Sequence, residues 1–294
     1  MHRKKLLATD LDGTFLNSNG SVTSENRDAI ARANSNGLEV VFVTGRPARW
    51  LQGVARSANH FNTIIGANGA FIADLERQVV VQTNPIDGNA LGNVAERILS
   101  KHSDSVFAIE RAFVGMPIPK STCDDYETMY VTNLSEFEYA ISPGYEVVWK
   151  NVDHIPVAPV EILLSKPDIT KVLVKPGDPR HWNPDSWLAE INNIVNGEVQ
   201  TTHASEHVVL AELSALGITK ATGLAQIANS KQLNHSEIVA VGDMPNDIPM
   251  LQWVGESWAV ANAHEEVLAI TKNHLPHSDE NAVAQLIDDL ISRI

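Results

Sequence analysis

The chain has 294 residues, of which 44% are hydrophobic and 20% charged, so it can build the cores of one large or two modest domains. A formal net charge of −14, without a basic stripe interleaved with aromatic residues, argues against a nucleic-acid partner. The single cysteine, Cys123, excludes an intrachain disulfide and a cysteine-based zinc site. No apolar run reaches the length of a membrane span, and Leu6–Ala8 is too short for a signal-peptide core, so we expect a soluble cytoplasmic protein without a membrane partner.

Five short apolar runs, each closed by turn residues, predict buried strands. They are LLAT at 6–9, EVVFVTG at 39–45, TIIGANG at 63–69, EIVAVGD at 237–243 and SWAVANA at 257–263. Helical patterns alternate with these runs: TSENRDAIARANSNG at 23–37, PNDIPMLQWV at 245–254 and ENAVAQLIDDLISRI at 280–294. This alternation predicts an α/β fold with a doubly wound, Rossmann-like parallel sheet.

The alternating pattern breaks between about residues 84 and 213. KVLVK at 171–175 and VVLAEL at 208–213 predict strands, and PDSWLAEINNIV at 184–195 predicts a capped helix. Seven of the 14 prolines fall between Pro143 and Pro184, which favours irregular connections there. We therefore expect a core of residues 1–83 and 214–294, with residues 84–213 inserted as a smaller α/β cap domain.

Polar residues follow four of the predicted core strands. They are Asp10 and Asp12, then Thr44, Gly45 and Arg46, then Asn68, and last Asp243, Asn246 and Asp247. Because ligands of open parallel sheets bind beyond the carboxyl ends of the strands, these four segments should converge on one crevice. Lys220, in GITKATGL, precedes a predicted helix where the chain returns to the core, and is the candidate cation for the same crevice.

These residue types suit phosphoryl transfer from a small anionic ester. Asp10 could attack phosphorus and form an aspartyl-phosphate, while Asp12 could protonate the leaving oxygen and then activate water. Carboxylates this close resist ionising unless a cation intervenes, and Asp10, Asp12 and Asp243 suit Mg²⁺. The groups expected to hold the charge on the phosphoryl oxygens are Thr44, Lys220 and the backbone amides of Leu11 and Gly13.

Four motifs in this order resemble those of the haloacid dehalogenase superfamily: DLDGTFL, VTGR, the lysine after the insertion, and GDMPND. More narrowly, NGA at 68–70, ELSALGITK at 212–220 and GDMPNDIPML at 242–251 resemble the Cof-type sugar-phosphatase branch. That branch carries a large α/β cap between its second and third motifs, where the pattern breaks here. The resemblance spans both ends of the chain and is weak inside residues 84–213.

The resemblance implies a role for each matching residue. Asp10 would be the nucleophile and Asp12 the general acid and base, with Thr44 and Lys220 binding phosphate. The implied ligands of Mg²⁺ are Asp10, the backbone carbonyl of Asp12, and Asp243, and the implied loop around metal, phosphate and lysine ends with Asn246 and Asp247. The implied function is Mg²⁺-dependent hydrolysis of a small phosphomonoester, such as a sugar phosphate, through an aspartyl-phosphate.

Several alternatives stay open on the sequence. A phosphomutase would carry the same motifs, and a non-catalytic sugar-phosphate-binding regulator could use the same fold, although it needs no nucleophile such as Asp10 beside an acid such as Asp12. Arg46 could bind substrate or could brace the crevice loops by pairing with an acid. Asn68 could contact the phosphate ester or satisfy a turn. The substrate itself and the oligomeric state are not encoded in any motif.

Two metal motifs compete with this interpretation. HASEH at 203–207 matches the H-x-x-E-H pattern of one group of zinc proteases, which needs His203 and His207 on one helical face. The strand-like VVLAEL that follows favours a strand and turn instead, from which the histidines could still line the crevice. DLDGT is not a calcium loop, because Thr14, Phe15 and Ser21 occupy positions that require other residues.

Overall fold

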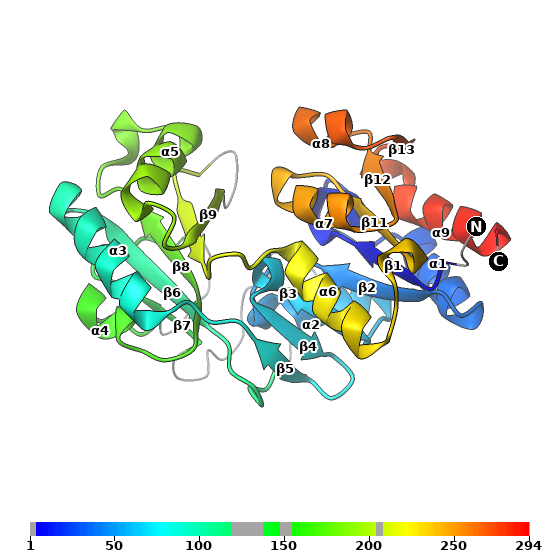
Figure 1. Ribbon diagram of the computed structural model, residues 1–294, viewed down its shortest axis with the longest axis horizontal. Coiled ribbons are helices and arrows are strands. Elements are labelled where there is room, and N and C mark those ends of the chain that lie inside the picture. Colours follow the sequence, from blue (N-terminus) through cyan, green and yellow to red (C-terminus); the bar gives the residue numbers. More distant parts are fainter. Residues whose placement is uncertain (1–3, 119–137, 148–154, 204–207, 294) are drawn as a thin grey trace. The chain divides into compact units, whose positions relative to one another are not determined.

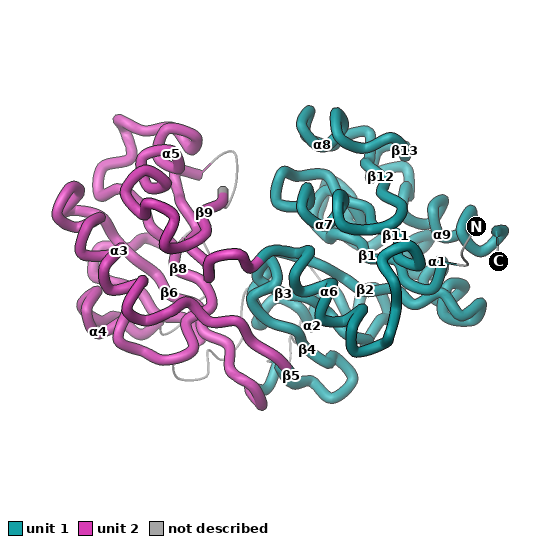
Figure 2. Tube along the Cα trace, in the orientation of Figure 1, with its two compact units in different colours: residues 1–81, 117–132, 219–294 teal, residues 82–116, 133–218 magenta. Residues whose placement is uncertain are grey.

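The computed structural model describes residues 4–118, 138–147, 155–203 and 208–293. The chain forms two compact units (Figure 2). Unit 1 comprises residues 1–81, 117–132 and 219–294, and unit 2 comprises residues 82–116 and 133–218. Both units combine helices with a sheet, so the predicted α/β class is confirmed, whereas the predicted boundaries after residues 83 and 213 stay a prediction. Within the described ranges, no helix is both long enough and apolar enough to cross a bilayer.

Unit 1 is built on an eight-stranded sheet with the order β13-β12-β11-β1-β2-β3-β4-β5 (Figure 1). The strands are β1 (Leu6–Thr9), β2 (Glu39–Val43), β3 (Thr63–Gly66), β4 (Phe71–Asp74), β5 (Val79–Thr83), β11 (Ile238–Gly242), β12 (Glu256–Val260) and β13 (Asn273–Leu275). Neighbours from β13 through β3 pair in parallel, and β4 pairs with β3 antiparallel. Every residue of β1 and β11 is buried, as expected for parallel strands that are covered on both faces.

The chain winds in opposite directions from the centre of this sheet. The helices of unit 1 are α1 (Ser24–Ser35), α2 (Leu51–Ala58), α6 (Lys220–Ser230), α7 (Ile248–Trp253), α8 (Glu265–Ile270) and α9 (Ala282–Ser292). The crossovers run from β1 to β3 and, the other way, from β11 to β13. Because such crossovers are right-handed, α1 and α2 are expected on the face opposite α7 and α8. The winding reverses between β1 and β11, which is where such sheets form a ligand-binding crevice.

Helix α1 shows how local sequence fixes this arrangement. The hydroxyl oxygen of Thr23 accepts a hydrogen bond from the Asn26 amide at 3.2 Å, which caps the helix start. The buried Asn26 side chain donates to the Phe15 carbonyl at 2.7 Å and accepts from the Ala284 amide at 3.0 Å. One satisfied polar side chain therefore joins α1 to α9 and to the turn that follows β1.

Unit 2 contains a five-stranded antiparallel sheet with the order β7-β6-β8-β10-β9. Its elements are α3 (Gly88–Lys101), β6 (Val106–Arg111), β7 (Tyr139–Ile141), α4 (Val160–Leu164), β8 (Ile169–Lys175), α5 (Pro184–Val195), β9 (Gln200–His203) and β10 (Ala211–Ser214). Residues of α3, α4 and α5 pack in one apolar core with residues of β6, β8 and β10. Trp187 of α5 is fully buried there, and its indole N–H donates to the Val174 carbonyl at 2.9 Å.

His60, which follows α2, predicts a pH dependence of stability. Its Nε2 lies 3.0 Å from the Val40 carbonyl, its ring packs edge-on against Phe42, and the residue is 2% exposed. Burial lowers its pKa from 6.5 to about 4, although the bond to Val40 opposes the shift. Between these values the unfolded chain binds more protons, so acidification should lower the free energy of unfolding by up to about 3 kcal/mol.

Urea unfolding at neutral and acidic pH tests this expectation with the His60→Gln variant. The variant should lose that part of the acid sensitivity. His274→Gln is the control, because the exposed His274 also has its Nε2 beside a backbone carbonyl, that of Thr271, at 2.9 Å. Equal acid sensitivity in His60→Gln and in the unaltered protein would contradict the assignment.

Candidate active site

Two acidic residues meet where the winding of the sheet reverses. Asp10 directly follows β1 and Asp243 directly follows β11, and these two strands pair in parallel. The Asp10 amide donates to the Val241 carbonyl at 3.0 Å, which fixes the register of the strand ends. Both aspartates are 5% exposed. The predicted convergence of separate chain segments at this edge is therefore seen for these two residues.

A buried lysine holds the acidic cluster together. Lys220, the first residue of α6, is 1% exposed, and its Nζ donates to Asp10 Oδ1 at 2.5 Å and to Asp247 Oδ1 at 2.6 Å. The other oxygen of Asp247 accepts the backbone amides of Asp243 and Met244, each at 3.1 Å. Both oxygens of Asp247 are thus engaged, so this residue orients the lysine and the loop after β11.

Glycine is required at the turn between β1 and α1. Gly13 has a φ of +81°, and a Cβ there would lie 2.3 Å from Asp243 Oδ2, so any side chain would displace that carboxylate. The Thr14 hydroxyl donates to Asp243 Oδ1 at 2.8 Å. Both oxygens of Asp243 are therefore positioned by this turn, in which Leu11 is fully buried.

The electrostatics of the cluster disfavour the ionised forms of Asp10 and Asp243, even beside Lys220. Burial raises the pKa of Asp10 well above its usual value; the charge of Lys220 opposes this rise, and the neighbouring aspartates add to it. Burial, followed by the charge of Asp247, raises the pKa of Asp243 to about 7. Burial alone lowers the pKa of Lys220, but the charges of Asp10 and Asp247 outweigh it, so the ammonium stays charged. One lysine does not neutralise three buried carboxylates.

The carboxylates fit a hard divalent cation. One oxygen from each of Asp10, Asp243 and Asp247 lies within 4.8 Å of the others. Because Asp247 already accepts three hydrogen bonds, Asp10 and Asp243 are the side chains best able to ligate an ion. Oxygen ligands of this type are those that Mg²⁺ takes in proteins, usually together with waters.

The carboxylate of Asp12 points to a different partner. Arg46 binds it through two bonds, with Nε to Oδ2 at 2.8 Å and Nη2 to Oδ1 at 2.5 Å. Arg46 is buried, whereas the Asp12 side chain is 50% exposed. The structure thus shows the bracing ion pair that was one of the two roles open to Arg46.

The remaining predicted residues form a second group linked to the first. The buried Thr44 hydroxyl accepts the Arg46 amide at 3.1 Å, and its carbonyl accepts the Asn68 amide at 3.0 Å. Asn68 has a left-handed φ of +57°, and its Oδ1 accepts from Asn246 Nδ2 at 3.0 Å. A Cβ on Gly45 would lie 3.3 Å from that same Asn68 oxygen. The loops after β1, β2, β3 and β11 therefore form one connected network.

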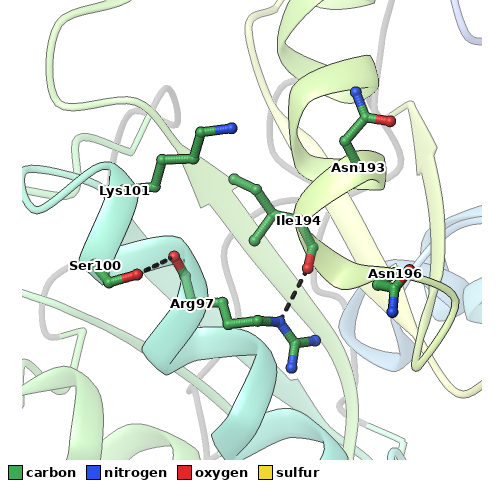
Figure 3. Close-up of a pocket in the computed structure, with 6 residues that line it drawn as sticks. All are labelled: Arg97, Ser100, Lys101, Asn193, Ile194 and Asn196. Atoms are coloured by element: carbon green, nitrogen blue, oxygen red, sulfur yellow. Dashed lines mark hydrogen bonds between the residues drawn. The ribbon is translucent and has the colours of Figure 1, made fainter.

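The competing zinc motif and a hollow in unit 2 do not belong to this network. His203 is the last residue of strand β9 in unit 2 and so does not lie on a helix, and His207 and Cys123 lie outside the described residues. A hollow of about 570 Å³ lies between α3 and α5 (Figure 3). Its cations are already paired, Arg97 with Glu198 and Lys101 with Glu190.

Sequence reasoning missed two residues that hold the network. Thr14 positions Asp243, and Asn262, in the loop after β12, donates to the Gly13 carbonyl at 2.7 Å. Thr14 lies inside the first motif and could have been singled out there. Asn262 belongs to none of the motifs that predicted the site. The only sequence signal for it was its position just after a predicted parallel strand, where ligand-binding residues are expected.

Comparison with known proteins identifies the family. The model of haloacid dehalogenase-like hydrolases matches residues 7–287. Two relatives from Bacillus subtilis are phosphatase YwpJ, 27% identical over 98% of this chain and 100% of its own, and 5-amino-6-(5-phospho-D-ribitylamino)uracil phosphatase YwtE, 25% identical over 98% of each. The solved structure of BT1666 from Bacteroides thetaiotaomicron shares the fold, with a TM-score of 0.73 at 21% identity over 98% of this chain and 96% of that one. The chain therefore belongs to the haloacid dehalogenase-like hydrolases, as its ordered motifs and their Cof-type resemblance predicted.

Proposed function

We propose that the protein is a Mg²⁺-dependent phosphatase that hydrolyses a small phosphomonoester, of the sugar-phosphate class, through an aspartyl-phosphate on Asp10. The observation that carries this proposal is the buried Asp10 carboxylate, which Lys220 holds at 2.5 Å beside the ligand-like carboxylate of Asp243. Both curated relatives described above are named phosphatases, and the substrate in the name of YwtE carries its phosphate on a ribityl chain. Residues 84–213 are proposed as the cap domain that selects the substrate.

In this proposal, Asp10, Asp243 and the backbone carbonyl of Asp12 would hold Mg²⁺. The ion would screen the attacking carboxylate from the phosphate and balance the negative charge of the cluster. Lys220 and Thr44, with the amides of Leu11 and Gly13, bind the phosphoryl oxygens. Gly45, Asn68 and Asn246 belong to the same binding loops, because their contacts join the ends of β2, β3 and β11.

The first half of the reaction transfers the phosphoryl group to the protein. A carboxylate oxygen of Asp10 forms a bond to phosphorus while the bond from phosphorus to the ester oxygen breaks. Asp12, which first takes up a proton from solvent as it leaves Arg46, gives that proton to the ester oxygen, which leaves as an alcohol. Arg46 occupies both carboxylate oxygens of Asp12, so this contact opens when Asp12 turns to the ester.

The second half returns the site to its starting state. Asp12, now ionised, takes a proton from a water molecule, and the water oxygen bonds to phosphorus. The bond between phosphorus and Asp10 breaks, which releases inorganic phosphate and regenerates both carboxyl groups. Lys220 keeps Asp10 in place through both halves because its second bond, to Asp247, anchors the ammonium.

Phosphate release from a panel of phosphorylated sugars, nucleotides and cofactors, assayed with Mg²⁺, tests the proposal. We expect turnover of at least one sugar phosphate, loss of activity on chelation with EDTA, and recovery when Mg²⁺ is added back. One inorganic phosphate should be released for each substrate molecule consumed. A phosphomutase would instead consume substrate without releasing inorganic phosphate. Activity that is indifferent to chelation would reject the metal role.

A further inference from the structure

The loop after β12 contacts both of the chain segments that carry the proposed metal ligands, the turn after β1 and the loop after β11. Asn262 Nδ2 donates to the Gly13 carbonyl at 2.7 Å, and the backbone amide of His264, two residues later, donates to the Asp243 carbonyl at 2.8 Å. One three-residue segment thus binds the turn after β1 and the residue after β11. Both acceptors are backbone carbonyls, and neither is a proposed metal ligand.

Asn262 is itself held in position. Its Oδ1 accepts the Ser278 amide at 2.9 Å, and Ser278 is 1% exposed. The neighbouring Asp279 accepts the Ser18 amide at 2.7 Å, which ties the same segment to the chain just after the Gly13 turn. The donor and the acceptor of the Asn262 amide are therefore both used, and each has a defined partner.

The Gly13 carbonyl matters because of what the rest of its turn contacts. The Cα of Gly13 packs so closely on Asp243 that a Cβ would lie 2.3 Å from Oδ2, and Thr14 donates to Oδ1 at 2.8 Å. The peptide before Gly13 carries the Asp12 carbonyl, which is the proposed third ligand. A shift of this turn would therefore move two of the three proposed ligands together.

We propose that Asn262 is a positioning residue for the divalent cation: its hydrogen bond to the Gly13 carbonyl sets the turn that aligns Asp243 and the Asp12 carbonyl. This inference rests on the proposed function, since it assigns the scaffold of the proposed metal site. Groups that orient metal ligands typically change metal affinity about 10- to 100-fold when they are lost. Asn262 acts through one intervening residue, so we expect about a tenfold effect.

The test is titration of the whole chain with Mn²⁺, followed by electron paramagnetic resonance, with Asn262→Asp as the variant. A carboxylate keeps the shape of the side chain and can still accept the Ser278 amide, but it cannot donate to Gly13. Its added negative charge would by itself strengthen cation binding, so weaker binding must come from the lost hydrogen bond. Asn273→Asp is the matched control, because Asn273 Nδ2 donates to the Ser257 carbonyl at 3.0 Å, away from the site.

We expect Asn262→Asp to raise the Kd for Mn²⁺ about tenfold, with Asn273→Asp unchanged. Turnover of Asn262→Asp should recover at high Mg²⁺, because its defect lies in metal binding and not in the catalytic groups. Unchanged or tighter Mn²⁺ binding by Asn262→Asp, or equal weakening in Asn273→Asp, would overturn the inference. If circular dichroism shows Asn262→Asp unfolded, Asn262→Ala is measured under the same criteria.

Measurements on the unaltered protein distinguish a failure of the proposed function from a failure of the role of Asn262. If it neither binds Mn²⁺ nor releases phosphate from any ester, the proposed function fails and this inference fails with it. If it does both, and Asn262→Asp binds Mn²⁺ equally well, only the role of Asn262 is overturned.

Discussion

The Asp10→Asn variant is expected to fold normally and to lose phosphatase turnover by about 10⁴-fold or more, as when a central member of a catalytic unit is removed. An asparagine amide has no anionic oxygen with which to form the bond to phosphorus. Its stability should hold or rise, because burial and the neighbouring aspartates already disfavour the ionised form of Asp10. Phosphate release and thermal unfolding, measured on the same preparation, check the two halves of this expectation.

An acid-quench experiment with phosphorus-labelled substrate makes the test specific to the nucleophile. The unaltered protein should carry label that alkaline hydroxylamine releases, and Asp10→Asn should carry none. Asp28→Asn is the control for charge, because Asp28 in α1 has a side chain that is 65% exposed, and its loss should leave turnover unchanged. Near-normal hydrolysis by Asp10→Asn would show that another group attacks phosphorus.

The central strands were predictable because helices cover both of their faces. Their sequences are almost continuously apolar, as in β1 and β11. This pattern can be recognised without knowing which strands pair with one another. Strand β13 was missed because it is only three residues long, two of them polar. Helix α3 was missed because its start, Asp87 followed by Gly88, is typical of a turn, although the Asp87 side chain caps the helix by accepting the Ala90 amide.

The candidate site was predictable to the extent that sheet topology determines it. Parallel strands bring their carboxyl ends to one edge, so Asp10 and Asp243 had to approach each other once β1 and β11 were neighbours. Side-chain partners depend on distances that no motif encodes. The pairing of Arg46 with Asp12, and the use of both oxygens of Asp247, follow from loops that meet only in the folded chain.

Replacing Lys220 by methionine should lower the free energy of unfolding by about 3–5 kcal/mol, because removing one partner of a buried ion pair leaves uncompensated charge. Lys220 is 1% exposed and is the cation bound to both Asp10 and Asp247. Its charge also opposes the rise in the pKa of Asp10, so the pKa of Asp10 should rise further in the variant. The folded variant then binds more protons than the unfolded chain, and its stability should fall as the pH rises.

Denaturant unfolding in EDTA, at acidic and at alkaline pH, measures both the loss in the free energy of unfolding and the direction in which it changes with pH. Lys231→Met is the control, because Lys231, just after α6, forms an ion pair with Glu39 at 3.0 Å with its side chain 37% exposed, and such surface pairs contribute below about 1 kcal/mol. Adding Asp10→Asn to Lys220→Met should stabilise the protein more than Asp10→Asn does alone, since it then removes a charge that has lost its cation, and the double variant should show no turnover. Simple additivity of the two changes would show that Lys220 does not stabilise the charge of Asp10. If Lys220→Met lowered the free energy of unfolding no more than Lys231→Met does, Lys220 would not hold the acidic cluster in place, and the nucleophile would need another source of stabilisation.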